Sequence, residues 1–125
     1  MNGKLYAHYA DYTGDWPWEH FSPREISCKC CGEMYLHKES MNALERLRDL
    51  VGPIRINSGH RCEKRNFGEG GVDNSMHLKV AFDCQCPKRD QADFVKAAEK
   101  AGFTGIGYLE YRTFVHVDMG RKRRW

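Results

Sequence analysis

The chain has 125 residues, of which 41% are hydrophobic and 30% charged, and its formal net charge is +3. This size suits one compact domain, so we expect a single domain over residues 1–125. No apolar run approaches the roughly 20 residues that cross a bilayer, so we expect no stable membrane insertion. The small positive charge, without a basic stripe interleaved with aromatic residues, argues against binding to nucleic acid.

Residues 1–20 are rich in aromatic side chains and lack a regular period, which predicts an irregular N-terminal strap whose rings cover the core. They contain no apolar segment typical of signal peptides, so we expect the chain to be made in the cytoplasm without a signal peptide. A short helix is then predicted to follow Ser22 as its N-cap, with Pro23 at the first helical position.

Two longer helices are predicted from apolar residues at helical spacing. The first covers residues 40–51, with Ser40 as its N-cap and Gly52 at its end, and the second follows Asp90 and ends at Gly102. Their apolar faces would consist of Met41, Leu44, Leu47 and Val51, and of Phe94, Ala97, Ala98 and Ala101.

Strands are predicted over residues 54–58, 80–84, 104–109 and 114–119. A long segment rich in Gly, Asn and Asp separates the first two strands, and a loop of this length inside a compact domain usually has a function. Because helices are mixed with strands that are joined partly by short turns, the α+β class is favoured.

The chain has six cysteines, at positions 28, 30, 31, 62, 84 and 86. Without a secretion signal, disulfides are not the first expectation. The run CKCC at 28–31 lacks the spacer and the matching second pair that are typical of zinc-binding motifs. We therefore expect buried thiols, with a disulfide or a second metal site as the alternatives.

The last five residues, RKRRW, form a basic tail. A basic terminus is most often solvated, which is the expectation here. The alternative is contact with an anionic polymer.

In the predicted strand 114–119, His116 and Asp118 lie on the face opposite the valines, because side chains alternate along a strand. His77 follows the long loop, and Asp83 lies on the strand after it. Two histidines and one carboxylate match the ligands of a catalytic zinc site, which keeps a further position for water.

Three segments resemble, in order, motifs of the peptidase M15 family, which includes zinc D-Ala-D-Ala carboxypeptidases and phage L-alanyl-D-glutamate endopeptidases. They are INSGHRC at 56–62, NFGEGGVDNSMHLK at 66–79 and FVHVDMG at 114–120. The resemblance extends from about Phe21 to Trp125. It implies a hedgehog/DD-peptidase-like α+β fold, a small antiparallel sheet with flanking helices, Zn²⁺ as cofactor, and hydrolysis of an amide bond in the peptide stem of peptidoglycan.

The resemblance implies that His77, Asp83 and His116 are the zinc ligands. The segment SMHLKVAFD is one residue shorter than the corresponding family motif and lacks its glycine. If the turn absorbs the deletion, Asp83 keeps the ligand position, which is our expectation. If the strand slips by one residue, every side chain changes face and Cys84 takes that position.

Three further residues are expected to contact substrate by the same resemblance. Arg61 would steady a carboxylate or carbonyl of the substrate, with a structural salt bridge as the alternative. Ser75 would contact the substrate or support a ligand. His60 replaces the family's usual tyrosine and would contact the substrate, with a hydrogen-bonded loop histidine as the alternative.

The general base is the second departure from the family pattern. Some members place an acid three residues before the last ligand, where this chain has Thr113. Other members carry a glutamate six residues before it, which corresponds to Glu110. We expect Glu110 to act as the base, with Asp118 as the other candidate.

The function expected from the sequence is that of a phage or prophage endolysin, a monomer that acts in the periplasm or cell wall after release. The alternative is a non-catalytic module on the same fold that binds zinc or the cell wall. The motifs do not distinguish a carboxypeptidase from an endopeptidase, so they do not identify the bond that is cut.

Overall fold

The computed structural model describes residues 3–68 and 79–125, and it confirms the α+β class. The strands are β1 (Lys4–Tyr6), β2 (Met34–Leu36), β3 (Ile56–Ser58), β4 (Ala81–Gln85), β5 (Gly105–Gly107), β6 (Phe114–Asp118) and β7 (Arg123–Arg124). The α-helices are α1 (Pro23–Ile26), α2 (Lys38–Val51), α3 (Glu63–Gly68) and α4 (Gln91–Ala101), and the 3₁₀ turns are η1 (Tyr9–Asp11) and η3 (Lys88–Asp90).

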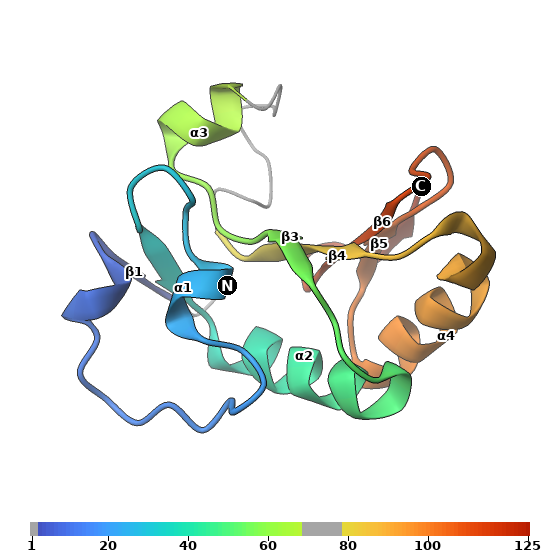
Figure 1. Cartoon of the computed structure of the whole chain (residues 1–125), viewed down its shortest axis with the longest axis horizontal. Helices are drawn as coiled ribbons and strands as arrows, with labels where there is room; N and C mark the ends of the chain where they lie inside the picture. Colours follow the sequence, from blue (N-terminus) through green and yellow to red (C-terminus); the bar gives the residue numbers. More distant parts are fainter. Residues whose placement is uncertain (1–2, 69–78) are drawn as a thin grey trace.

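Within the described ranges, five strands form the main sheet in the order β3-β4-β6-β5-β7, while β1 and β2 form a separate ribbon. The neighbours in the main sheet are antiparallel except β5 and β7, which run parallel. Helices α2 and α4 lie on one side of this sheet (Figure 1). Helix α2 packs against α4, and α4 packs on β6.

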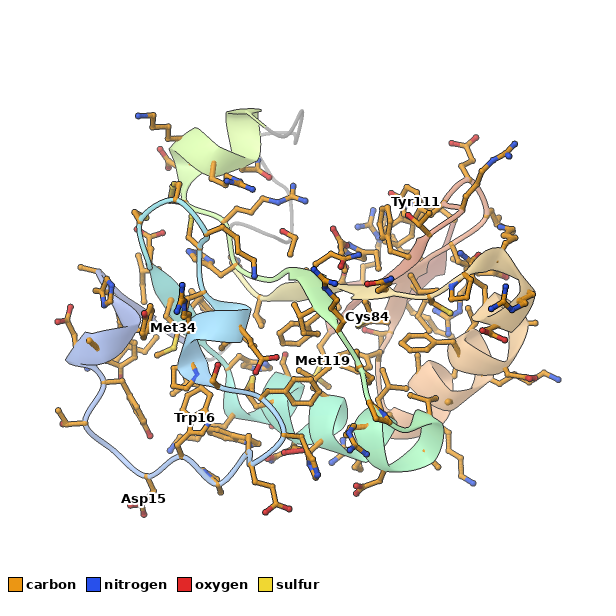
Figure 2. The ribbon with its side chains drawn as sticks, viewed as in Figure 1. Asp15, Trp16, Met34, Cys84, Tyr111 and Met119 are labelled. Atoms are coloured by element: carbon orange, nitrogen blue, oxygen red, sulfur yellow. The ribbon has the colours of Figure 1, made fainter. Side chains whose placement is uncertain are left out.

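The core lies between the main sheet and these two helices. Alternation along β4 and β6 sends one set of side chains into this core. Cys84, labelled in Figure 2, belongs to this inward set and is fully buried. The other buried side chains of this layer include Phe82, Ile106, Val115 and Val117 from strands, and Met41, Leu44, Leu47, Phe94 and Ala98 from helices. The opposite set on β4 and β6 is therefore available for a site.

The predicted helices are confirmed, with corrections at the start and end of the first. Helix α2 begins at Lys38 and not at Ser40, because the side chain of His37 accepts the hydrogen bond from the Ser40 amide and acts as the N-cap. Ser40 is buried inside the first turn. At the other end, Val51 is 37% exposed, so the apolar face ends before it.

The N-terminal strap is not irregular throughout, since β1 pairs with β2 and η1 follows it. Trp18 and Phe21 are buried in the core. The short helix α1 begins as predicted, with Ser22 as N-cap and a reciprocal bond between Glu25 and the Ser22 amide. The aromatic strap thus covers the core around α1.

Two further elements differ from the prediction. Helix α3 forms within the segment predicted as loop, and β7 extends the sheet at the chain end.

No helix in the described part of the chain is long and apolar enough to cross a bilayer.

Candidate functional site

The candidate site lies on the face of β4 and β6 that points away from the core. The register of this antiparallel pair sets Asp83 opposite His116 and Ala81 opposite Asp118. Asp83 and His116 are each 7% exposed, so the pair is almost completely shielded from solvent. Cys84 faces the core, where burial raises the pKa of its thiol well above the ordinary value. Asp83, not Cys84, therefore shares a face with His116.

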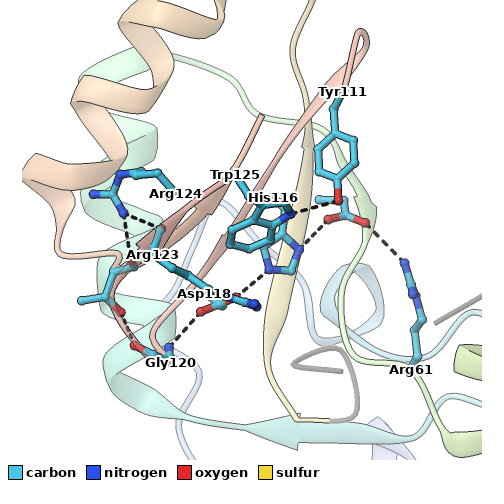
Figure 3. A network of polar contacts seen from close by, with 10 residues as sticks. Arg61, Tyr111, His116, Asp118, Gly120, Arg123, Arg124 and Trp125 are labelled. Atoms are coloured by element: carbon cyan, nitrogen blue, oxygen red, sulfur yellow. Dashed lines mark hydrogen bonds and ion pairs between the residues drawn. The ribbon is translucent and has the colours of Figure 1, made fainter. Parts of the chain in front are cut away.

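The His116 ring contacts a carboxylate at each nitrogen (Figure 3). Its Nε2 lies 2.6 Å from Asp118 Oδ2, and its Nδ1 lies 3.1 Å from Asp83 Oδ1. Asp118 is fully buried and also accepts a hydrogen bond from the Gly120 amide at 2.9 Å. With a proton on Nε2 donated to Asp118, the lone pair on Nδ1 faces Asp83.

The electrostatics of this pair follow from burial and hydrogen bonding. Burial lowers the pKa of His116, but hydrogen bonds to Asp118 and Asp83 outweigh it, so the pKa is raised. Burial raises the pKa of Asp118, but the bonds from His116 and from the Gly120 amide outweigh it, so that pKa is lowered. Asp118 thus stays ionised beside the imidazole.

The facing atoms of Asp83 and His116 fit a shared cation. Two acceptors that face each other at 3.1 Å repel unless a proton or a cation lies between them. Two ligands of a tetrahedral zinc, at about 2.0 Å from the metal, stand about 3.3 Å apart. The spacing and the donor types therefore suit zinc, and the buried Asp118 behind His116 resembles the carboxylate that orients a metal-binding histidine.

Close packing of β5 holds Asp118 in place. Gly105 is the partner of Asp118 across β5 and β6. A Cβ at Gly105 would overlap the Asp118 carboxylate, so this position requires glycine. Gly105 was not among the residues predicted for the site, although a glycine in a strand often marks such a close approach.

Trp125 covers His116, so the tail is solvated only in part: Arg121, Lys122 and Arg123 are exposed as expected, whereas Arg124 and Trp125 are half-buried. The two rings lie 5.1 Å apart between centroids, and Trp125 Nε1 donates to Tyr111 Oη at 3.3 Å. The Arg123 guanidinium lies 4.1 Å above the Trp125 ring. Pairing of β7 with β5 fixes this arrangement (Figure 3).

Arg61 is brought to the site from the loop after β3. Its Nη2 lies 3.4 Å from Asp83 Oδ2, its Nε donates to Ser58 Oγ at 3.1 Å, and its Nη1 lies 3.4 Å from Asn66 Oδ1. The salt bridge that was the alternative for Arg61 is thus present in the structure.

The remaining predicted site residues are placed differently. His60 is 2% exposed and is held between the Lys79 carbonyl and Glu33, as a hydrogen-bonded loop histidine would be. Glu110 is exposed in the turn between β5 and β6. His77 and Ser75 lie outside the described residues.

Comparison with known proteins identifies the family. The model of the Peptidase M15 family matches residues 19–118. The peptidoglycan L,D-endopeptidase MepK of Escherichia coli K12 is 33% identical over 91 residues, which cover 66% of this chain and 50% of MepK. MepK of Shigella flexneri matches equally well. The chain spans about half the length of these curated relatives. The three motifs, the α+β fold and the match over most of the length agree, and the chain belongs to the peptidase M15 family.

Proposed function

We propose that this chain is a zinc-dependent peptidase that hydrolyses an amide bond in the peptide stem of peptidoglycan. The observation that carries the proposal is the buried pair formed by Asp83 and His116, whose facing atoms need a cation or a proton between them. Membership of the M15 family and similarity to a peptidoglycan L,D-endopeptidase support the choice of reaction and substrate.

In this proposal, Asp83 and His116 hold the zinc ion together with His77, which lies outside the described residues. When bound, zinc supplies Lewis acidity that polarises an amide carbonyl and activates water. Asp118 accepts a hydrogen bond from the protonated Nε2 of His116 and so fixes the tautomer that would leave Nδ1 as the metal ligand. Asp118 is thus a positioning residue.

The general base is assigned to Glu110. Asp118 does not suit this task, because its Oδ2 already accepts from His116 and its Oδ1 from the Gly120 amide. An exposed carboxylate such as Glu110 has oxygens available to take a proton from water. Thr113, at the other family position for the base, has no group that accepts a proton at neutral pH.

Arg61 is proposed to bind a carboxylate or carbonyl of the substrate. Its contacts with Ser58, Asn66 and Asp83 fix the plane of the guanidinium before substrate arrives. A fixed planar fork loses little entropy on binding and favours a bidentate acceptor. Ser75 is proposed to contact substrate near the metal.

We further infer that the biological role is that of an endolysin, which rests on the resemblance of FVHVDMG to the shorter family members. Expression in a bacterial host, with and without a protein that permeabilises the inner membrane, tests it. Lysis only on permeabilisation is expected. Lysis under neither condition would contradict this role.

Mass spectrometry of purified peptidoglycan after incubation with the zinc-loaded protein tests the activity and identifies the bond. New fragments with free peptide termini are expected from the wild type. The variant Glu110→Gln should keep its zinc and lose turnover. If folded, zinc-loaded wild-type protein binds peptidoglycan without producing fragments, the chain is a binding module and not a peptidase.

A further inference from the structure

A second group of metal-binding side chains lies outside the candidate active site. Among the described residues, the sulfurs of Cys28, Cys30, Cys31 and Cys62 all lie within 4.8 Å of one another. The sulfur of Cys28 is 3.4 Å from that of Cys30 and 3.6 Å from that of Cys62, and the last two are 3.4 Å apart. We call these four residues the cysteine cluster.

The cluster corrects the expectation of buried thiols. Cys30 and Cys31 are exposed, Cys62 is half-buried and only Cys28 of the four is buried. Exposed thiols gain nothing from burial, so packing does not explain their arrangement. Cys84 and Cys86 lie apart from the cluster and are buried as expected.

The spacing of the four sulfurs suits one central ion. Four thiolates around a tetrahedral zinc, each about 2.3 Å from the metal, stand about 3.8 Å apart. A disulfide joins two sulfurs at about 2.05 Å, so it does not account for four sulfurs that lie close to one another. Four sulfurs in a tetrahedral arrangement are typical of zinc or iron sites.

The first part of the cluster is a tight turn. The Gly32 amide donates to the Cys28 carbonyl at 2.9 Å, and the Cys28 amide donates to the Glu33 carbonyl at 2.8 Å. These bonds fold the chain back within five residues, so that all three thiols of the turn reach one point. The spacing CKCC, which does not match a standard motif, is accommodated in this way.

The fourth sulfur comes from the segment after β3, which packs on the end of α1. The His60 amide donates to the Ile26 carbonyl at 2.9 Å, and a Cβ at Gly59 would lie 2.5 Å from that same oxygen. His60 Nε2 also lies 2.7 Å from Glu33 Oε1. These contacts bring Cys62 to the turn, and they explain the glycine at position 59 of the motif INSGHRC.

A backbone donor and cationic side chains lie beside the sulfurs. The Arg65 amide donates to Cys62 Sγ at 3.4 Å. Arg24 and Lys29 line the recess beside the cluster, together with one acid, Glu25. Four thiolates around Zn²⁺ carry a net charge of about −2, which two cationic side chains and backbone N–H donors reduce.

We propose that Cys28, Cys30, Cys31 and Cys62 bind a structural zinc ion, separate from the candidate catalytic site. Each thiol releases its proton to solvent when it binds the ion. Four thiolates leave no position for water, so the ion holds the chain together and takes no part in hydrolysis.

The zinc ion would also position Arg61. Arg61 lies between His60, which is held by Glu33, and Cys62, which would be held by the metal. Its backbone is then fixed on both sides, while its side chain points to Asp83. This part of the inference rests on the proposed function, whereas the metal site itself does not.

The experiment uses the full chain, purified under reducing conditions with zinc, and counts bound metal by native mass spectrometry. The variant His116→Ala, which disrupts the candidate catalytic site, should retain one zinc ion. Cys62→Ser should bind one zinc ion fewer than the wild type, because the cysteine cluster is then incomplete, and it should melt at a lower temperature. Cys86→Ser is the matched control, because it removes a thiol outside the cluster, and should keep the metal content of the wild type.

Replacement of zinc by Co²⁺ identifies the ligands, since thiolates give a ligand-to-metal charge-transfer band in the near ultraviolet. The band should persist in His116→Ala and weaken in Cys31→Ser, which changes an exposed side chain and leaves the core intact. A folded, reduced His116→Ala protein without metal or without this band would overturn the proposal. So would an intact mass that shows disulfides within the cluster in protein purified from the bacterial cytoplasm.

Discussion

At the scale of single residues, the geometry around His116 determines what the site can do. Its Nε2 is committed to the buried Asp118, and its Nδ1 is directed at Asp83. A proton and a cation therefore compete for the same place between Nδ1 and Asp83, and metal binding requires the neutral imidazole. Because the pKa of His116 is raised, the proton competes with the cation up to a higher pH than it would at an unperturbed histidine.

The substitution Asp118→Asn tests the positioning role. It keeps the shape of the side chain but removes the charge that holds the Nε2 proton of His116. We expect zinc affinity at the candidate catalytic site to fall by about 10- to 100-fold, as for other carboxylates behind a metal-binding histidine. Competition with a chromophoric chelator measures the affinity.

The matched control is Asp93→Asn, which removes an exposed carboxylate from α4 and should leave the affinity unchanged. Equal affinities for Asp118→Asn and the wild type would mean that Asp118 only stabilises the fold.

At the scale of elements, the site depends on how closely β5 approaches β6. The pairing of Gly105 with Asp118 leaves no room for a side chain on the glycine. The Asp118 carboxylate therefore fills the space that a side chain at position 105 would take. Strand β5 supports the site because Gly105 has no side chain.

The substitution Gly105→Ala should destabilise the fold by about 1–3 kcal/mol, as overpacking of a buried position usually does. Urea unfolding of the zinc-loaded protein measures this change. Because the added methyl group meets Asp118 itself, the combination with Asp118→Ala should cost less than the sum of the two single changes. Strictly additive effects would show that the strain lies elsewhere.

The elements differ in how far the sequence predicts them. Strands β4 and β6 were predicted to within about a residue, since alternation of buried and polar residues is a local signal. The expectation of Asp83 over Cys84 came from the family resemblance, and the structure places Asp83 on the face of His116. Helix α3 and strand β7 were missed because α3 is short and β7 is defined only by its pairing with β5.

The side chains that depend on distant contacts were also hard to predict. Trp125 contacts His116 because β7 pairs with β5. The sulfur of Cys62 lies beside that of Cys28, although 34 residues separate them in the sequence. Neither contact leaves a periodic pattern in the sequence. A second metal site was only the alternative expectation for the cysteines, because the run CKCC has no matching pair nearby and the fourth thiol comes from a distant segment.

At the scale of the whole molecule, the two proposed metal sites lie at the two ends of one loop. Within the segment 59–62, Cys62 belongs to the cysteine cluster, and the neighbouring Arg61 contacts the Asp83 side chain at the sheet. A strong chelator would remove zinc from both sites, so loss of activity on chelation alone does not say which ion is needed. Variants of one site at a time are required.

The most direct test of the central claim compares peptidoglycan hydrolysis by the wild type and by Asp83→Ala, with zinc retained at the cysteine cluster in both. Release of peptide fragments is measured by mass spectrometry at equal protein and zinc concentrations. The variant Asp83→Ala is expected to stay folded, keep the cluster ion and release no fragments above background. Fragment release by Asp83→Ala at the wild-type rate would contradict the assignment of Asp83 and His116 as the catalytic metal site.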